Sequence, residues 1–297
     1  MKIKTRRYYI YYLARLAFFI VALVPLNISL MLAAFFGRKA FRLVGKYRDI
    51  AVNNLCLALG GSREDNMRIA ERVFENVAKN GAEWVKLSLL DPENLGDMVT
   101  EFHGAEHLDG VLSEGKGAII VAAHFGNWEL LGIYLRNIGY KGTMIVRRLY
   151  FHKYDDFITN LRLRYNVHGI YRDSSPKAML RVLKKGEVLG ILADQDIDSV
   201  DGTFVDFFGR PSFTPTAPVK LAMATGAKLV PAFVIRKKDN THKIVIEKPI
   251  DVGALRNDEE AVKRYTQEWT NVLERYVKAY PDQWVWMHRR WKTEVKK

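Results

Sequence analysis

The sequence contains almost no cysteine and comparatively little acid. Its one cysteine, Cys56, excludes an intrachain disulfide and any zinc site built from several cysteines. Because Cys56 lies in a stretch with helical spacing and no histidine nearby, we expect a small buried hydrophobic residue there. Lysine and arginine total 46 against 33 acids, and the net charge of +13 indicates an anionic partner, either nucleic acid or an anionic membrane.

Several signatures of other enzyme classes are also missing. The sequence has no G-x-S-x-G elbow, no Walker loop and no G-x-G-x-x-G, and no repeat or Gly/Ser linker divides it. His103 and His107 are four residues apart, but a predicted strand-to-helix break separates them and no third ligand accompanies them, so we expect no zinc. The 297 residues, 48% of them hydrophobic, suffice for one large domain.

The positive charge is concentrated around a hydrophobic segment near the N-terminus. The first 50 residues contain ten lysines and arginines and one acid, and residues 8–36 between the basic clusters are almost continuously apolar. A straight helix over that segment would be ~43 Å long, longer than a ~30 Å hydrocarbon core, and Pro25 should kink or break it. No signal-peptide cleavage site follows. We expect residues 1–37 to form a membrane-anchoring helix or hairpin. One clean crossing would leave one basic cluster outside, whereas a bent, re-entrant or interfacial hairpin keeps both clusters in the cytoplasm.

Residues 38–297 have the pattern of an α/β domain. Helical spacing dominates residues 38–90, and helices and strands then alternate. The predicted strands cover 99–102, 118–123, 142–146, 167–171, 187–193, 228–235 and 243–247. The predicted helices cover 105–114, the residues from 128 onward, 152–165, the stretch from Ser174-Ser175-Pro176 to Gly186, 214–226 and 257–280. Residues 194–213 are expected to be a long loop. The alternation predicts a mainly parallel sheet flanked by helices, forming one catalytic domain.

A histidine and a glutamate flank the turn after the second predicted strand. The apolar, β-branched run 118–123 stops at His124, Asn127 suits an N-cap position, and Glu129 lies in the first turn of the next helix. Ligands bind at the carboxyl ends of strands in open α/β sheets. A carboxylate five residues after the histidine can orient the imidazole and stabilise its cation, so His124 and Glu129 are the candidate catalytic residues.

The run His-Phe-Gly-Asn-Trp-Glu at 124–129 resembles the signature of membrane acyltransferases of the H-x-x-x-x-[DE] superfamily. It looks most like the branch that contains the late acyltransferases of lipid A biosynthesis. Four later segments are also similar to that branch, so the resemblance covers roughly the whole chain in five separated places. It implies a glycerolipid acyltransferase-like fold.

Arg147 and Arg148 follow the strand 142–146 and form the second similar segment. A guanidinium at a strand end can hold a phosphate with two hydrogen bonds, and a solvated pair of surface charges is the alternative. In the family an arginine follows this strand, and Arg147 matches it best. The family usually continues with Pro and Asn-Pro, whereas this chain continues Arg-Leu-Tyr, so the choice between the two arginines stays open.

The third similar segment is Asp194-Gln195-Asp196 together with Phe204-Val205-Asp206-Phe207-Phe208-Gly209. A D-x-D pair can coordinate a divalent ion with phosphates, or its acids can pair with the arginines and orient the loop. The resemblance favours positioning over a metal. The fourth segment, from Thr214 to Ala222, has small residues at a predicted helix start, which allow close approach of a lipid or phosphate. A plain capped core helix is the alternative.

The fifth similar segment is the tail from Gln283 to Thr293, which interleaves tryptophan with basic residues. Such a pattern suits nucleic acid or a membrane interface, where tryptophan is enriched. With the hydrophobic N-terminal segment in view, we expect the interface, with the tail holding the sheet's carboxyl edge against lipid headgroups, and no nucleic acid partner.

The resemblance implies transfer of a fatty acyl group from acyl carrier protein or acyl-CoA to a hydroxyl of a lipid A precursor or a related glycolipid or lysophospholipid. In that chemistry His124 removes the hydroxyl proton, Glu129 orients it, N–H groups near Asn127 stabilise the oxyanion, and an arginine holds the phosphate of the acceptor. Attack is direct, and neither metal nor organic cofactor is required. The expected location is the cytoplasmic face of a bacterial inner membrane.

Two other functions are compatible with parts of the sequence. One is a membrane glycosyltransferase that uses Asp194 and Asp196 with a divalent metal. The other is a non-catalytic protein that binds anionic lipids. EDTA would inhibit the first, and substitution of His124 would leave the second unaffected.

Overall fold

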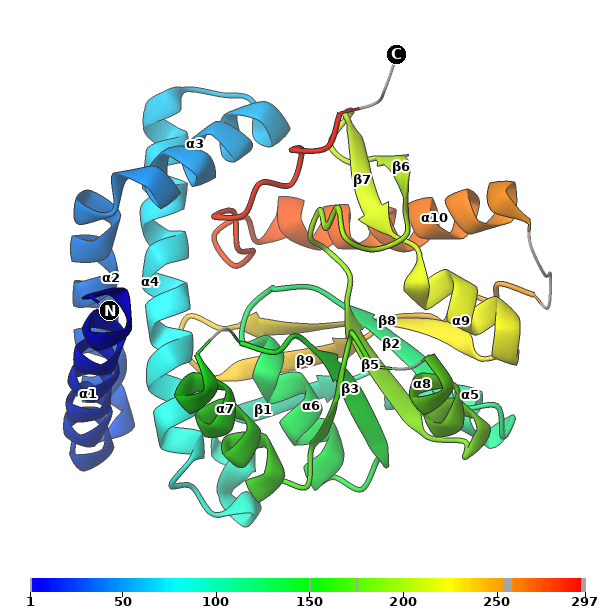
Figure 1. Ribbon diagram of the computed structural model, residues 1–297, viewed down its shortest axis with the longest axis horizontal. Helices are drawn as coiled ribbons and strands as arrows, with labels where there is room; N and C mark the ends of the chain where they lie inside the picture. Colours follow the sequence, from blue (N-terminus) through cyan, green and yellow to red (C-terminus); the bar gives the residue numbers. More distant parts are fainter. Residues whose placement is uncertain (1, 150, 175, 254–257, 295–297) are drawn as a thin grey trace.

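The computed structural model describes residues 2–149, 151–174, 176–253 and 258–294, and is built around a seven-stranded sheet (Figure 1). The strands are β1 (Val99–His103), β2 (Ala118–Ala122), β3 (Gly142–Val146), β4 (His168–Tyr171), β5 (Val188–Leu192), β6 (Gly202–Asp206), β7 (Pro211–Pro215), β8 (Lys228–Arg236) and β9 (His242–Ile246). The helices are α1 (Lys2–Leu23), α2 (Leu26–Leu43), α3 (Gly45–Leu59), α4 (Arg63–Leu87), α5 (Ala105–Ser113), α6 (Trp128–Asn137), α7 (His152–Arg164), α8 (Pro176–Lys184), α9 (Ala217–Thr225) and α10 (Glu259–Ala279), and a 3-10 turn covers Pro92–Asp97.

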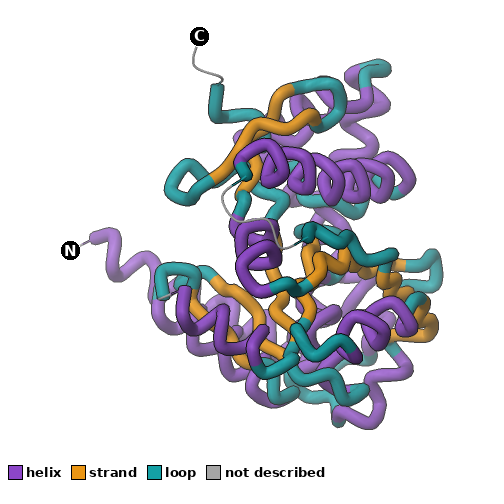
Figure 2. Tube along the Cα trace, turned by 90° about the vertical axis from the view of Figure 1, so that its right-hand side faces the viewer, coloured by secondary structure: helices purple, strands orange, loops and turns teal. Residues whose placement is uncertain are grey.

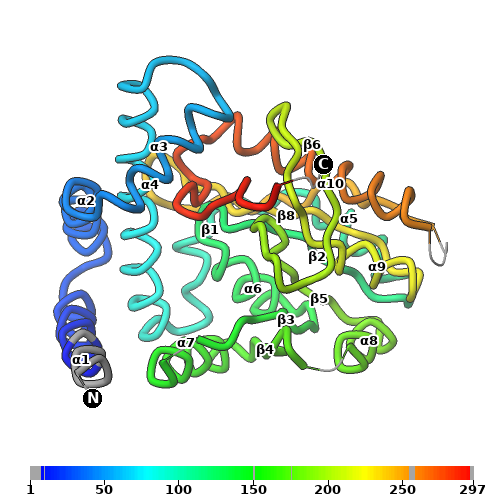
Figure 3. The backbone as a smooth tube through the Cα atoms, turned by 45° about the horizontal axis from the view of Figure 1, so that its top comes forward, coloured from blue at the N-terminus to red at the C-terminus, as the bar shows by residue number. Residues whose placement is uncertain are grey.

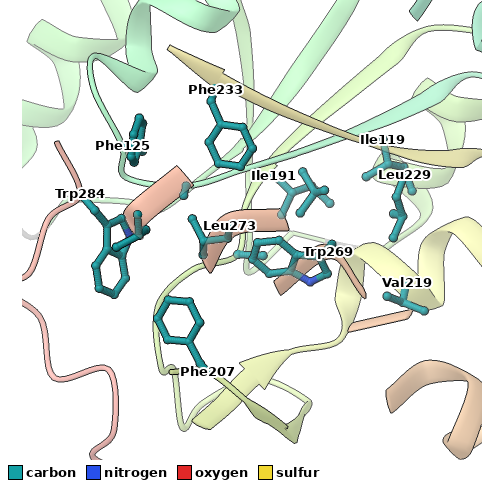
Figure 4. Packing of buried hydrophobic residues seen from close by; sticks show 14 of the residues in the cluster. Ile119, Phe125, Ile191, Phe207, Val219, Leu229, Phe233, Trp269, Leu273 and Trp284 are labelled. Atoms are coloured by element: carbon teal, nitrogen blue, oxygen red, sulfur yellow. The ribbon is translucent and has the colours of Figure 1, made fainter. Parts of the chain in front are cut away.

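The main sheet is mostly parallel, which confirms the predicted α/β sheet flanked by helices. Its strand order is β1-β9-β8-β2-β5-β3-β4, and β8 with β9 is its antiparallel pair. Every residue of the central strand β2 is buried, which explains its unbroken apolar run. Ile119 and Val121 pack in the core shared with α9 and α10, while Ile120 packs on the other face with residues of α5 and α6. Figure 4 shows Ile119 and Ile191 in the first core, with Trp269 and Leu273 of α10.

The segment 194–213, predicted to be a loop, contains an antiparallel hairpin instead. β6 and β7 pair from Gly202–Pro215 to Asp206–Pro211, and the rings of Phe204 and Phe213 meet at 5.5 Å. The hairpin turn needs residues with positive φ, which Phe208 and Gly209 supply at 59° and 70°. Figure 2 shows this pair of strands apart from the main sheet, beside α10. Thr214 ends β7, and α9 starts after Thr216, later than predicted.

The N-terminal arm, defined here as α1 and α2, packs against α4 and α7. The predicted break at Pro25 is confirmed, since α1 ends at Leu23 and α2 starts at Leu26. Lys86 of α4 donates to the carbonyls of Ala22 and Val24 and so holds the turn between the two helices. Figure 1 shows the arm along one side of α4. The boundary drawn at residue 37 falls inside α2, so the division into anchor and catalytic domain stays a prediction.

A membrane-crossing helix, one form that we expected for the arm, is not found. Over the described ranges, no helix is both long and apolar enough to span a bilayer. Pro25 divides the hydrophobic segment, Arg15 interrupts α1, and α2 ends with Arg38, Lys39 and Arg42. The arm nevertheless carries many exposed large apolar side chains, among them Tyr9, Tyr12, Leu13, Leu16, Phe19, Ile20, Leu23, Met31, Phe35 and Phe36.

The C-terminal strap, defined here as residues 283–293, crosses the molecule above the sheet (Figure 3, red). Our expectation that its tryptophans contact lipid headgroups was wrong for Trp284 and Trp286, because both are completely buried in the core. Asn54 of α3 donates to the backbone carbonyls of Trp286 and His288 and fixes the strap on one side. Trp284 and Trp286 are therefore part of the core and do not face a membrane surface.

Candidate active site

The pairing of β2 with β5 brings together two residues that are 70 positions apart. Ala122 pairs with Leu192 in a parallel register, so the residues that follow, His124 and Asp194, emerge side by side at the carboxyl edge of the sheet. This edge is the usual ligand-binding edge of open α/β sheets. The backbone N–H of Ala193 donates to Ala122 and continues the ladder to the point where the polar residues begin.

His124 is held by Asp194 through both its ring and its backbone. Nδ1 lies 2.8 Å from Oδ1 of Asp194, and the backbone N–H of His124 donates to Oδ2 at 3.0 Å. The side-chain amide of Gln195 lies 3.3 Å from the same ring nitrogen. With Nδ1 facing the carboxylate, Nε2 is the nitrogen left to accept a proton. The side chain of His124 is 24% exposed, whereas that of Asp194 is fully buried.

The electrostatic surroundings favour the charged form of both partners. Burial by itself would lower the pKa of His124, but the charge and hydrogen bond of Asp194, with a smaller contribution from Glu129, raise it above the ordinary value. Burial would raise the pKa of Asp194, yet the attraction of His124 and its hydrogen bond keep that pKa below its usual range. An imidazolium formed during a reaction would therefore be stabilised at this position.

Glu129, the predicted partner of His124, makes its hydrogen bonds elsewhere. Its two oxygens accept from Nε and Nη2 of Arg162 on α7, at 2.8 and 2.6 Å. This forked geometry suits a guanidinium better than an imidazole. The ring partner of His124 is Asp194, so the expected orienting contact from Glu129 needs correction, although its charge still contributes to the raised pKa of His124.

Asn127 occupies the N-cap position of α6 without capping it. Its side chain is completely buried, donates to Glu83 at 2.7 Å and accepts from the indole of Trp84 at 3.0 Å. Glu83 also accepts from Arg236, so a buried network on α4 and β8 fixes the turn after His124. The interpretation of Asn127 as a substrate-binding residue receives no support from this placement, which makes it a support for the loop.

The two arginines after β3 lie in different surroundings. A position directly beside the His124 loop would require β2 and β3 to pair, but β5 stands between them. Arg147 lines the same cavity as His124, whereas the guanidinium of Arg148 stacks on the ring of Tyr171 at 4.0 Å. Arg172, which directly follows β4, joins Arg147 at the cavity and was not predicted. Arg147 was selected because it directly follows a strand, and the same criterion would have selected Arg172.

The other predicted site residues divide between the cavity and the core. Gln195 and Asp196 line the cavity, and Asp196 accepts from the backbone and hydroxyl of Thr293 on the strap. Thr214 is fully buried and accepts from Arg290, so it lies in the core. Within the described ranges, no three histidine, cysteine or acidic side chains are grouped to hold a metal ion. Asp194 and Asp196 bind different neighbours.

A cavity of about 690 Å³ extends from His124 between the sheet and α6. Its polar part is lined by His124, Glu129, Arg147, Arg162, Arg172, Gln195, Asp196 and Lys292. Its remaining wall is mostly apolar, with Ile120, Ala122, Leu131, Leu135, Met144, Val167, Val188, Ile191 and Leu192. Gly132, Gly142 and Gly190 also line it, and of these three only Gly190 has space for a Cβ atom.

Comparison with known proteins agrees with this architecture. The model of the family described as bacterial lipid A biosynthesis acyltransferase matches residues 1–293. The lipid A biosynthesis lauroyltransferase of Escherichia coli (strain K12) is 29% identical over 290 residues, which are 97% of this chain and 92% of that protein. The lipid A biosynthesis palmitoleoyltransferase of the same strain is 24% identical, over 91% of this chain and 87% of that protein.

A further relative acts in a different lipid class. The phosphatidylinositol mannoside acyltransferase of Mycobacterium tuberculosis (strain ATCC 25618 / H37Rv) is 31% identical over 43% of this chain and 42% of that protein. The fold, the site at the carboxyl edge of the sheet and these relatives together make the chain an acyltransferase. It belongs to the bacterial lipid A biosynthesis acyltransferase family, which confirms the resemblance noted in the sequence.

Proposed function

We propose that the protein moves a fatty acyl chain from a thioester to a hydroxyl of a phosphorylated glycolipid, such as a lipid A precursor, with His124 as the base. The observation that carries this proposal is the pairing of His124 with Asp194 at one end of a largely apolar cavity. The cavity supplies a place for an acyl chain next to a group that can take a proton. Family membership supports the same chemistry.

Nε2 of His124 takes the proton of the acceptor hydroxyl as its oxygen attacks the thioester carbonyl. The C–O bond forms, the carbonyl electrons move to oxygen, and the imidazolium is stabilised by Asp194. When the tetrahedral intermediate collapses, the C–S bond breaks and the departing thiolate takes the proton from Nε2. A positioned base contributes roughly 10²–10⁴-fold to such a step.

The rest of the site completes this mechanism. The proposed oxyanion donors are the backbone N–H groups of Trp128 and Glu129 at the start of α6. The N–H groups of His124, Phe125 and Gly126 before them, and of Leu130 after them, already bind other acceptors. Arg147 and Arg172 lie at the cavity and suit a phosphate of the acceptor. Glu129 acts through Arg162, holding that guanidinium in the polar part of the cavity.

We further propose that the exposed apolar side chains of the arm lie in the membrane interface, so the acceptor stays in the bilayer while it reacts. The donor is acyl carrier protein or acyl-CoA, both cytosolic, which puts His124 on the cytoplasmic face of the inner membrane. A periplasm-active phosphatase fused after Lys297 should then be silent. Strong phosphatase activity in that fusion would refute this orientation.

The central test uses purified variants with a bilayer acceptor and an acylated carrier protein. His124→Ala should lose at least 10²-fold in kcat. Asp194→Asn should also lose activity, because an amide neither orients Nδ1–H nor stabilises the cation. His103→Ala is the matched control, since His103 is exposed, pairs with Glu101 and does not line the cavity. Wild-type-like turnover in folded His124→Ala would sink the mechanism.

The acyl-chain role of the cavity is tested at Gly190. A Cβ there would meet its nearest atom, Cβ of Met144, at 3.6 Å, so a small side chain fits while a larger one enters the cavity. Gly190→Leu should reduce transfer from long acyl donors more than from short ones. Gly110→Leu, at an exposed glycine of α5 with open space around it, is the control. Equal losses for all chain lengths would contradict this role.

EDTA should leave acyl transfer unchanged, whereas it would inhibit a glycosyltransferase that uses a D-x-D metal site.

A further inference from the structure

The C-terminal strap pairs with the backbone of the His124 loop. The N–H of Gly126 donates to the carbonyl of Gln283 at 2.9 Å, and the N–H of Val285 donates to the carbonyl of His124 at 3.0 Å. Phe125 and Trp284 form an antiparallel bridge between these two bonds. The loop that carries His124 is thus held by a segment about 160 residues later in the chain.

The side chain of Trp284 reaches the carboxylate that binds His124. Its indole Nε1–H donates to Oδ2 of Asp194 at 2.9 Å, the oxygen that also accepts from the backbone of His124. Both Asp194 and Trp284 are completely buried, so water does not compete for this bond. Figure 4 shows Trp284 enclosed in the core near Phe125 and Phe207.

We propose that Trp284 is a positioning residue for the reaction, whose indole N–H fixes Asp194 so that the carboxylate holds His124 in the orientation of a base. This proposal rests on the proposed function of His124. The indole bond does two things. It prevents rotation of the carboxylate away from Nδ1, and it draws electron density toward Oδ2, away from the oxygen that faces His124.

The second effect gives the proposal a signature that simple packing lacks. Without the indole donor, the backbone N–H of His124 still holds Oδ2, so the carboxylate stays near Nδ1 on average. Its negative charge is then shared with one partner fewer and binds the imidazolium more strongly. The pKa of His124 should therefore rise further. The other charged or titratable groups that face this pair are Glu129 with its partner Arg162, and His288, Arg290 and Asp196 around the carboxylate. Burial lowers the pKa of His288 to about 4, so it is neutral over the range of the titration.

The test is Trp284→Phe in the full chain, which keeps an aromatic ring and removes the donor. NMR titration of the labelled imidazole of His124, assigned with His124→Gln, should show a pKa higher by about half a unit to one unit. The acid limb of kcat/KM should move to higher pH by the same amount, with kcat reduced. The titration does not depend on turnover, so it remains readable even if the acyl-transfer assignment fails.

Two matched tryptophans serve as controls. Trp286→Phe removes a bond of the same strap, from Nε1 to the carbonyl of Pro281. Trp269→Phe removes a buried indole whose N–H has no hydrogen-bond partner among the described residues. Neither should move the His124 titration. A shift equal to that of Trp284→Phe in either control, or no shift in Trp284→Phe, would overturn the proposal.

A measurement on the unmodified protein covers the case in which Trp284→Phe does not fold. The indole N–H resonance of Trp284 should follow the protonation of His124, because both bind the same carboxylate. The resonance of Trp269 should stay constant through that range. An indole signal of Trp284 that ignores the His124 titration would contradict the coupling.

Discussion

The N-terminal arm and the C-terminal strap both mix aromatic rings with basic side chains, yet the fold treats them in opposite ways. In the arm, Tyr9 and Phe19 are 68% and 62% exposed. In the strap, Trp284 and Trp286 have no exposed surface. Similar composition therefore leads to a solvent-facing apolar surface at one end of the chain and to a core at the other.

The difference comes from how many neighbours each segment has. The arm lies on α4 and α7 and leaves its outer face uncovered, as Figure 1 shows for α4. The strap lies between α3, the β6–β7 hairpin and the His124 loop, and contacts all three. A sequence that mixes aromatic and basic residues does not by itself distinguish an exposed apolar surface from a buried segment of the core.

The largest expected effect separates the two regions by stability. Trp286→Ala removes a fully buried ring and should lower the free energy of unfolding by about 3–5 kcal/mol. Phe19→Ala, at an exposed position of the arm, should change it by less than about 0.5 kcal/mol. Urea unfolding in detergent measures both. Similar losses of unfolding free energy at the two positions would contradict the contrast between a buried strap and an exposed arm.

The second effect concerns binding to lipid vesicles. Here the exposed arm, and not the buried strap, should be the sensitive region. Phe19→Ser should reduce partitioning onto anionic vesicles roughly tenfold or more, since burying one large apolar side chain contributes about 1.5–3 kcal/mol. Ile138→Ser is the control, because Ile138 is similarly apolar and 43% exposed but lies at the end of α6. Flotation assays measure both. Equal losses for the two variants would show that the arm has no special role.

A smaller effect is expected where the arm is attached. Lys86→Met removes the ammonium that binds two carbonyls of the turn between α1 and α2, at a cost of about 1 kcal/mol. Hydrogen exchange should become faster in the arm and stay unchanged in the strap. Lys184→Met, at an exposed position of α8, should change neither segment. Unchanged exchange in the arm would mean that the apolar contacts hold it without Lys86.

The smallest effect concerns the pH dependence of kcat/KM, which a substitution in the arm should leave unchanged. His124 must be neutral to act as a base, and its pKa is raised by Asp194 and Glu129 despite burial. The value of kcat/KM should therefore fall as pH falls through a pKa above the ordinary ~6.5 of histidine. Phe19→Ser should leave this acid limb in place, and Asp194→Asn should move it to lower pH. A limb at or below 6.5 in the wild type would contradict the raised pKa.

Much of the sheet could be predicted because buried parallel strands have a strong local signal. The apolar runs of β2 and β5 are short, contain β-branched residues and begin just after a glycine, and both were found within a residue or two. The hairpin β6–β7 was missed because its strands are half-exposed and its turn uses Phe208 at positive φ, a residue that does not signal a turn.

The site was predicted in its location but not in its contacts. His124 was identified from its place after a strand, but its partner depends on the register between β2 and β5, which no local spacing encodes. Glu129 is close to His124 in sequence, but its carboxylate binds Arg162 instead of the imidazole. The role of Trp284 could not be read from the tail, because its composition fits a membrane interface as well as a core.

The bridge between Phe125 and Trp284 has a consequence for the order in which the enzyme is made. Strand pairing and the fixing of Asp194 both need residues that leave the ribosome long after His124 does. The apolar arm, by contrast, consists of the first residues to be made. The proposed base is therefore aligned only after nearly the whole chain has been synthesised.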